Sequence, residues 1–230
     1  MEYEIYKEYL NCKKTGDQFQ KDHFTLRNKI HCNEDIKSIL VSGKNRASLL
    51  GVQLLIVFRT KNDGRYQALT IKRSDTVAAR PGFYQFVPSG GFEVFENSDE
   101  HNRDELKENY NILWAIYREY LEELIIGNKT DYEYGQGGET IAKIEREPEI
   151  KRISGYLNEK KAYFEFLGSA VELCGLRNEL SFVLRIDTTE YSEMIFNSNN
   201  ESIKINRYYI DEIEKHIDTN KLNPSSAALW

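Results

Sequence analysis

Hydrophobic residues gather in short runs from residue 49 onward, and turn-forming residues separate these runs. The apolar run at residues 49–59 predicts a buried β-strand. Lys61-Asn62-Asp63-Gly64 is a hairpin signal, so residues 66–73 are expected to form the returning strand. A third, short strand is predicted at residues 83–87, where a proline and a pair of glycines end it.

The second half of the chain alternates between helical and strand patterns. We expect helices at residues 105–125, 149–161 and 208–217, strands at residues 163–173, 179–186 and 203–205, and a mobile loop at the glycine-rich residues 127–147. Strands interleaved with helices predict an α/β or α+β fold rather than an all-helical one.

Residues 1–47 are polar and have no sustained helical period. Because roughly 40 residues rarely fold alone, we expect them to be an N-terminal extension packed on a main domain at residues 48–230. Phe24 and Leu26 alternate with polar neighbours and predict a short edge strand, and residues 34–40 predict a helical turn or two. The segment shows no convincing pair of helices for a helix-turn-helix, which disfavours a DNA-binding regulator.

The amino-acid composition argues against several classes of function. Hydrophobic residues make up 40% of the 230, enough for a core, so wholesale disorder is excluded. Acidic side chains outnumber basic ones by 37 to 31, and the resulting net charge of −6 argues against a protein that coats nucleic acid or an anionic membrane. The longest apolar stretch, residues 49–58, is about half of a membrane span.

The cysteine content and the N-terminal residues indicate in which cellular compartment the protein is expected. Three cysteines are an odd and sparse set, which fits free thiols in a reducing cytoplasm. Cys12, His23, His31 and Cys32 lack the paired spacing of structural zinc sites. The acidic N-terminus has no apolar signal core, so a cytoplasmic location is expected.

The predicted helix at residues 105–125 carries the most informative pattern. At 100° per residue, an apolar stripe runs from Leu113 to Leu124, and Glu119, Glu122 and Glu123 share the opposite face. Three carboxylates at this spacing repel one another, and together they suit a hard divalent cation such as Mg²⁺ or Mn²⁺. Acidic triplets also occur on helices that only face solvent, and that alternative stays open.

A glycine turn upstream of the helix favours the cation. Pro88-Ser89-Gly90-Gly91 follows a predicted strand, and a glycine pair lets backbone groups approach an ion or a phosphate closely. A strand, a glycine turn and then a helix with the pattern Arg-Glu-x-x-Glu-Glu together favour a site for phosphate-bound metals.

These residues resemble the signature of the Nudix superfamily, G-x5-E-x7-R-E-U-x-E-E-x-G-U, in which U is a bulky apolar residue. Gly90 and Glu96 match its first half, and residues 118–126 match its second half, except that Ile125 stands where the signature has glycine. Between Glu96 and Arg118 lie 21 residues where the signature has seven, which places an insertion at about residues 97–112. The lengthened box resembles a bacterial Nudix-like branch that is sometimes fused to helix-turn-helix regulators.

The resemblance implies an α/β/α sandwich with a mixed sheet between helices, and a hydrolase that cleaves the pyrophosphate bond of a nucleoside diphosphate linked to another moiety. It implies Mg²⁺ or Mn²⁺ held by Glu119, Glu122, Glu123 and the Gly90 carbonyl. Glu119 or Glu123 would act as the base, and Arg118 would orient the carboxylates through charge-assisted hydrogen bonds.

Further residues follow from the same resemblance. Arg73 and Arg80 would face substrate phosphates, although surface arginines also serve solubility. Phe83 could stack on a base, although alternating aromatic residues in a strand are more often packed in a core. Glu96 and Glu201 are weaker candidates for metal ligands or for a base.

Two function classes remain open at this stage. The three carboxylates favour an enzyme, whereas the lengthened box and Ile125 favour a Nudix-fold module that senses a nucleotide without turnover. The expected partner is a small nucleotide or nucleoside-diphosphate derivative, and a capped RNA end is the one nucleic acid left open. The insertion would either cover the cleft or make a contact in a homodimer.

Overall fold

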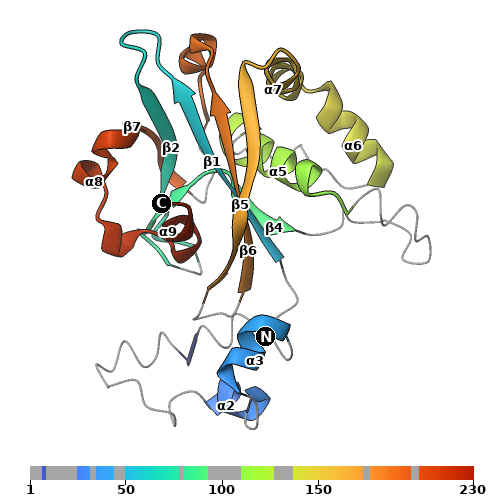
Figure 1. The fold of residues 1–230 in the computed structure, drawn as a ribbon, viewed down its shortest axis with the longest axis vertical. Helices are drawn as coiled ribbons and strands as arrows, with labels where there is room; N and C mark the ends of the chain where they lie inside the picture. The colour runs from blue at the N-terminus through green and yellow to red at the C-terminus, as the bar shows by residue number, and fades with distance from the viewer. Residues whose placement is uncertain are drawn as a thin grey trace.

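The computed structural model describes residues 7–8, 25–31, 35–43, 50–77, 80–92, 110–126, 137–172, 177–197 and 202–230. A mixed sheet dominates these residues (Figure 1). Its seven strands are β1 (Leu50–Arg59), β2 (Tyr66–Arg73), β3 (Tyr84–Phe86), β4 (Ser89–Phe92), β5 (Ala162–Glu172), β6 (Arg177–Ile186) and β7 (Ser202–Tyr209).

The sheet has the order β3-β2-β1-β6-β5, with β4 also paired to β1 and β7 also paired to β2. β1 and β6 run parallel, and the other pairs are antiparallel. β1 is therefore the central strand. At its N-terminal end, β1 lies between β4 on one side and β6 on the other.

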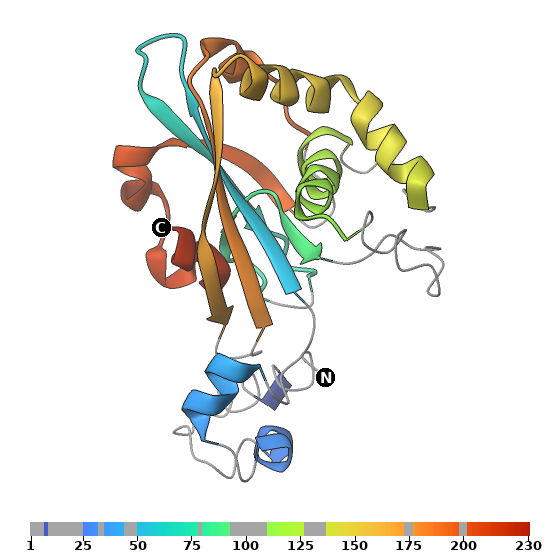
Figure 2. The same cartoon turned by 45° about the vertical axis from the view of Figure 1, so that its right-hand side comes forward.

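Helices cover both faces of the sheet (Figure 2). On one side lie α5 (Ile112–Tyr120), a π-helical segment η2 (Leu121–Ile126), α6 (Gly137–Arg146) and α7 (Pro148–Asn158). On the other lie α8 (Ile213–His216) and α9 (Pro224–Leu229). Short 3₁₀ turns complete the described chain: η3 (Thr189–Glu193), η4 (Ile210–Glu212) and η5 (Thr219–Lys221).

β1 contributes to a core on each side, because its side chains alternate between the two faces. Val52, Leu54, Ile56 and Phe58 belong to the core under α5 and α7, while Leu55 belongs to the smaller core under α8. Burial on both faces explains the near-continuous apolar run of this strand. The predicted α/β/α sandwich with a mixed sheet is confirmed.

Several predicted boundaries are wrong for identifiable reasons. The loop expected at residues 127–147 contains α6, whose Ile144 is fully buried, and the nearby glycines concealed its helical spacing. The helix expected from residue 105 begins at Ile112, because Asn111 caps it by accepting a hydrogen bond from the backbone N–H of Leu113 at 2.9 Å.

Two further differences from the prediction concern β7 with the helix after it and the described N-terminal residues. The strand expected at residues 203–205 is longer and covers residues 202–209, because β7 pairs with β2 along its whole length. The helix expected at residues 208–217 therefore starts later, with α8 beginning at Ile213. Leu26, expected in an edge strand, lies in helix α2 (Thr25–His31), and α3 (Ile36–Ser42) follows it, so the described N-terminal residues do form two short helices. The extension at residues 1–47 stays a prediction.

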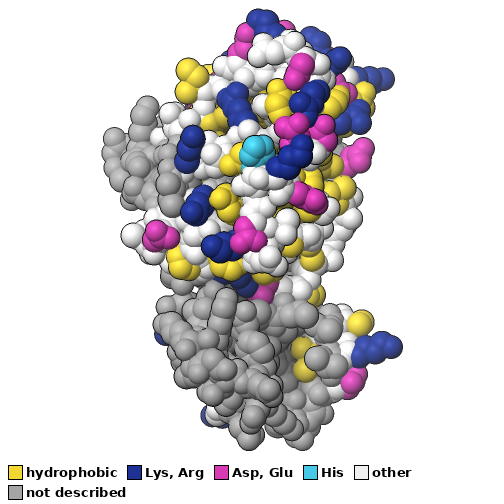
Figure 3. All heavy atoms as spheres, turned by 90° about the vertical axis from the view of Figure 1, so that its left-hand side faces the viewer, with side chains coloured by type: hydrophobic (Ala, Val, Ile, Leu, Met, Phe, Trp, Pro, Cys, Tyr) yellow, Lys and Arg dark blue, Asp and Glu magenta, His cyan; other side chains and the backbone are white. Residues whose placement is uncertain are grey.

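The surface carries both signs of charge. On the face shown in Figure 3, basic and acidic side chains are interspersed over the described residues rather than gathered by sign. Within the described part of the chain, no helix has the length and apolar character needed to cross a membrane.

Two buried tyrosines join the end of α5 to η3. The hydroxyls of Tyr120 and Tyr191 lie 3.2 Å apart, and both side chains are almost completely buried. Burial raises the pKa of both hydroxyls, so each stays protonated and one donates to the other.

We predict that Tyr191→Phe costs about 1–2 kcal/mol of unfolding free energy, because it leaves the Tyr120 hydroxyl buried without its bond. The double change Tyr120→Phe with Tyr191→Phe should cost less than the sum of the two single changes. Urea unfolding of the three variants measures this coupling, and simple additivity would contradict it.

Candidate active site

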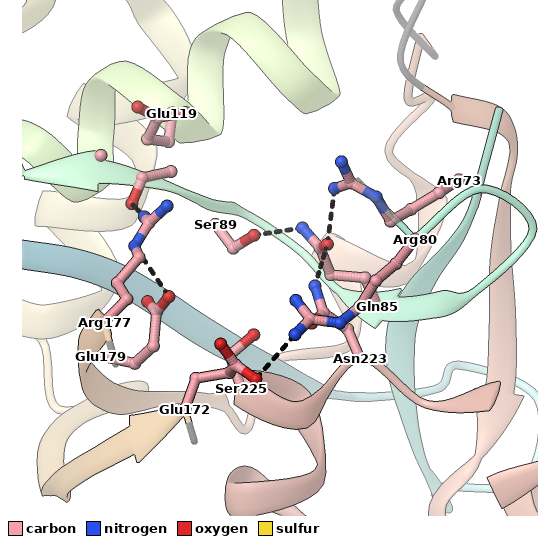
Figure 4. Close-up of a pocket in the computed structure, with 12 residues that line it drawn as sticks. Arg73, Arg80, Gln85, Ser89, Glu119, Glu172, Arg177, Glu179, Asn223 and Ser225 are labelled. Carbon is pink, nitrogen blue, oxygen red and sulfur yellow. Dashed lines mark hydrogen bonds and ion pairs between the residues drawn. The ribbon is translucent and has the colours of Figure 1, made fainter. Parts of the chain in front are cut away.

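A cavity of about 350 Å³ opens where β4, α5, the ends of β5 and β6, and the start of α9 meet (Figure 4). Its lining consists of charged and polar side chains and two glycines: Arg73, Arg80, Gln85, Ser89, Gly90, Gly91, Glu119, Glu172, Arg177, Glu179, Asn223 and Ser225. A cavity of this polarity is suited to a charged or hydrogen-bonding ligand rather than to an apolar one.

Gly90 lets helix α5 approach strand β4 very closely. A Cβ atom added at Gly90 would lie 2.0–2.2 Å from the carboxyl atoms of Glu119. Glu119 therefore rests directly on the backbone of this residue, a position that only glycine leaves open. The turn predicted at these glycines is wrong, because Ser89–Phe92 pair with β1 as strand β4. The strand nevertheless receives a carboxylate from the helix at Gly90.

Arg118 holds the carboxylate of Glu119 in place. The Nη2 atom of Arg118 lies 2.7 Å from Oε1 of Glu119, and the same nitrogen donates to the carbonyl of Gly91 at 3.0 Å. Both side chains are largely buried, with 15% and 12% exposed, so the ion pair is only weakly screened by solvent. Arg118 thereby ties α5 to β4 and orients the carboxylate at the edge of the cavity.

Glu123 contacts the residue before the glycines. Its Oε2 accepts a hydrogen bond from the backbone N–H of Ser89 at 2.9 Å, and the residue is 6% exposed. Glu122 is partly buried, and neither Glu122 nor Glu123 is among the residues that line the cavity. The 100°-per-residue spacing ends at Tyr120, because residues 121–126 form the wider π-helical segment η2.

The candidate metal ligands converge only in part. Within the described part of the chain, no three His, Cys, Asp or Glu side chains come close enough to hold a metal ion. Glu119 and Glu123 nevertheless contact adjacent residues of β4, and the carbonyl of Gly90, one of those residues, accepts a hydrogen bond from Arg177. Such an oxygen set fits Mg²⁺ or Mn²⁺, because Mg²⁺ usually takes one or two carboxylates and completes its shell with water and substrate phosphate.

The opposite end of the cavity carries two of the predicted arginines. Arg80 pairs with Glu172 at 2.8 Å, and its backbone adopts a left-handed conformation with φ of 48°. A non-glycine residue in this conformation costs roughly 1 kcal/mol, and such strain tends to occur at functional sites. Arg73 donates to Oε1 of Gln85 at 2.8 Å.

A chain of hydrogen bonds connects these two ends. Oε1 of Gln85 also accepts from Asn223 at 2.8 Å, and Nε2 of Gln85 donates to the hydroxyl of Ser89, the first residue of β4. Asn223 stands at the N-cap of α9 but makes no side-chain capping bond. It directs its amide into the cavity instead, at the expense of the usual helix cap.

A third arginine, Arg177, was not identified from the sequence. It donates to the Gly90 carbonyl at 3.0 Å, and its Nε lies 3.0 Å from Oε1 of Glu179 (Figure 4). Arg177 and Glu179 are two apart at the start of β6, so they share one face of the strand. That spacing could have indicated that both residues face one site. It was missed because the strand was predicted to begin at residue 179, which placed Arg177 in the linker before it.

The remaining predicted residues lie elsewhere. Phe83 is partly buried and does not line the cavity. Glu96 and Glu201 lie outside the described residues, as does most of the insertion at about residues 97–112. Besides Arg177 and Glu179, sequence reasoning missed Gln85, Glu172, Asn223 and Ser225, because nothing local to them indicates a site.

We predict that Gly90→Ala lowers the unfolding free energy by about 1–2 kcal/mol, because the new Cβ must push the flexible carboxylate of Glu119 off β4. The matched control is Gly155→Ala in α7, where a Cβ would meet nothing within 4 Å. That change should be neutral or stabilising by up to about 1 kcal/mol, because alanine favours helices. Equal effects of the two changes in urea unfolding would refute the close contact.

Comparisons with known proteins add the following. No protein-family model matches the sequence, and no curated protein matches it either. Among solved structures, the chain is similar to the NUDIX domain of Shewanella oneidensis NrtR in complex with ADP ribose, with 12% identity, a TM-score of 0.42, and coverage of 87% of this chain and 92% of that one.

Two other solved structures give comparable values. A NUDIX hydrolase from Alicyclobacillus acidocaldarius shows 14% identity and a TM-score of 0.45, over 80% of this chain and 90% of that one. A bifunctional NMN adenylyltransferase/ADP ribose pyrophosphatase from Francisella tularensis, complexed with AMP and an Mn ion, shows 11% identity and a TM-score of 0.47, over 94% of this chain and 49% of that one. Likenesses at this level carry no inference about activity, substrate or metal. The Nudix resemblance predicted from the sequence is thus found again among solved structures.

Proposed function

We propose that the protein hydrolyses the pyrophosphate bond of a nucleoside diphosphate linked to another moiety, with the help of Mg²⁺ or Mn²⁺. The observation that carries the proposal is the division of one polar cavity into two ends. Glu119 lies on Gly90 of β4 at one end, and Arg73 and Arg80 lie at the other. Each end also holds a group of the opposite charge, because Arg177 lies beside Glu179 at the first end and Glu172 pairs with Arg80 at the second. A cavity that combines carboxylates with arginines suits a diphosphate that is bound and attacked in the same place.

The arginine end supports phosphate binding. A guanidinium group presents five N–H donors in a plane, so Arg73 and Arg80 can keep their bonds to Gln85 and Glu172 and still donate to a phosphate. The amide of Asn223 and the hydroxyl of Ser225 add neutral groups suited to sugar or phosphate oxygens. The described lining offers no aromatic ring, so this cavity would hold the diphosphate and its sugar rather than a stacked base.

The carboxylate end supports hydrolysis. A divalent ion held by Glu119, Glu123 and the Gly90 carbonyl would neutralise the diphosphate and lower the pKa of an attacking water. Glu119 lines the cavity, so its carboxylate is placed to take the proton of that water. Arg118 keeps that carboxylate in one orientation, and Glu123 keeps the start of β4 in place through the N–H of Ser89.

Nucleotide binding without turnover is the competing function, and one observation favours it. Glu122 does not line the cavity, and the three acidic side chains of α5 and η2 do not gather into one group. A sensing module would need only the arginine end and the polar groups around it.

We predict metal-dependent turnover of at least one compound in a panel of ADP-ribose, dinucleotides, nucleotide sugars, NAD-like compounds and capped RNA ends. Glu119→Gln should lower kcat at least about 100-fold, because it removes the proton acceptor. Losing the ion pair with Arg118 should also lower the melting temperature, while the amide oxygen keeps the hydrogen bond to Arg118 and the fold is retained. Changing Glu122 and Glu123 together to Gln should abolish turnover.

The matched control is Glu145→Gln, an exposed carboxylate on α6 that should leave turnover unchanged. Product release with Mg²⁺ or Mn²⁺ is the measurement. If no compound is turned over, yet one of them raises the melting temperature, the protein is a sensor rather than a hydrolase.

Arg73 gives a separate prediction. Arg73→Met should raise KM for the active compound about tenfold and change kcat little, because this arginine binds phosphate away from the attacked bond. Lys72→Met, the adjacent residue on the opposite face of β2, should leave KM unchanged. A fall in kcat with constant KM for Arg73→Met would place Arg73 at the reaction itself.

A further inference from the structure

Gln85 stands in the middle of a row of polar side chains at the arginine end of the cavity. Its strand, β3, lies between β2 and the segment that enters α9, where the N–H of Asn223 donates to the carbonyl of Tyr84 at 2.8 Å. On β2, Gln85 is paired with Ile71, two residues before Arg73. Because alternate residues of a strand share a face, Arg73 and Gln85 lie on the same side of the sheet.

One oxygen of Gln85 holds a partner on each side. Its Oε1 accepts from Nη1 of Arg73 at 2.8 Å and from Nδ2 of Asn223 at 2.8 Å (Figure 4). Its Nε2 donates to the hydroxyl of Ser89. Gln85 is only 1% exposed, so bulk water does not compete for these bonds. Both atoms of its amide therefore have fixed partners in the cavity wall.

Arg73 dictates the direction of both amides in the row. A guanidinium can only donate, so the atom of Gln85 that meets Arg73 must be the carbonyl oxygen. Asn223 must then present its NH₂ group to that oxygen, which turns its own Oδ1 away. That Oδ1 lies 3.5 Å from Nη1 of Arg80, a long contact that again meets a donor. The four side chains thus form one ordered chain with an arginine at each end.

We propose that Gln85 is a positioning residue that sets the two arginines of the cavity for a ligand with two linked phosphates. It acts on Arg73 directly and on Arg80 through Asn223. An arginine has many rotamers, and a side chain that is held before the ligand arrives loses less entropy on binding. The inference rests on the proposed function only in giving these arginines a phosphate to bind.

A purely structural role is the competing explanation. Gln85 satisfies polar neighbours in a buried position, and its loss would then lower stability without changing the choice of ligand. A positioning role predicts instead that most of the effect disappears once Arg73 is absent. It also predicts a larger effect on a ligand that reaches both arginines than on one that needs a single arginine.

The test uses the metal-free full-length protein, with inorganic pyrophosphate and orthophosphate as probes and titration calorimetry as the measurement. The wild type should bind pyrophosphate more tightly than orthophosphate. Gln85→Met keeps a similar size without the amide, and it should weaken pyrophosphate binding about tenfold and orthophosphate binding less than about threefold. A wild type without this preference, or a Gln85→Met variant that keeps it, would overturn the inference.

A double-mutant cycle then shows whether Gln85 acts through Arg73. In the Arg73→Met background, Gln85→Met should weaken pyrophosphate binding less than about threefold, because its charged partner is gone. A loss that stays near tenfold in that background would contradict a positioning role. If Gln85→Met does not fold, Gln85→Asn decides by the same comparisons, since its shorter side chain keeps the amide but withdraws it from Arg73.

The matched control is Gln67→Met, which makes the same change on β2 at a partly buried residue outside the cavity lining. It should leave the affinities for both probes unchanged. A loss of pyrophosphate binding in this variant equal to that in Gln85→Met would assign the effect to the sheet as a whole and remove the special role of Gln85.

These outcomes require no turnover, so they are separate from the proposed hydrolysis. A protein that hydrolyses no compound of the panel, yet loses pyrophosphate binding in the coupled way, would retain the positioning role of Gln85 and lose the hydrolase proposal. Turnover with an unchanged KM in Gln85→Met would do the reverse. A raised KM with little change in kcat would support both.

Discussion

The candidate site depends on the contact that α5 and the following segment η2 make with three consecutive residues of β4. Glu123 accepts from the N–H of Ser89, Glu119 rests on Gly90, and Arg118 donates to the carbonyl of Gly91. A side chain at Gly90 would separate the two elements. The same absence of side chains that permits the contact lets Arg177 and Arg118 reach the carbonyls of Gly90 and Gly91, so packing and chemistry share one constraint.

Charge in the cavity is organised in pairs. Arg118 faces Glu119, Arg80 faces Glu172, and Arg177 faces Glu179. Away from bulk water such pairs are strong but expensive to form, because both groups lose hydration. A negatively charged ligand would therefore enter by sharing arginines that the protein has already desolvated and oriented. The net charge of the whole chain says little about this region, because pairing cancels it locally.

Local sequence signals located the elements closest to the site. The β1–β2 hairpin was predicted within a residue at each boundary, because a turn signal between two apolar runs is sufficient to define it. α6 was missed because glycines obscure its start, although Ile141 and Ile144 pack on the core. The π-helical segment η2 was missed because spacing at 100° per residue assumes an unbroken α-helix.

The sequence by itself determined the chemistry at Gly90 and Gly91: two glycines, an arginine and acidic residues at Nudix-like spacing. These residues lie on β4 and on α5 with η2, and both parts of the motif can be recognised in the sequence. Only the tertiary structure brought Arg177, Glu179 and Asn223 to the same cavity, since each lies more than 80 residues from Gly90 and no local pattern marks it. The physical reason is the pairing of β1 with both β4 and β6, a non-local contact that places distant strand ends side by side.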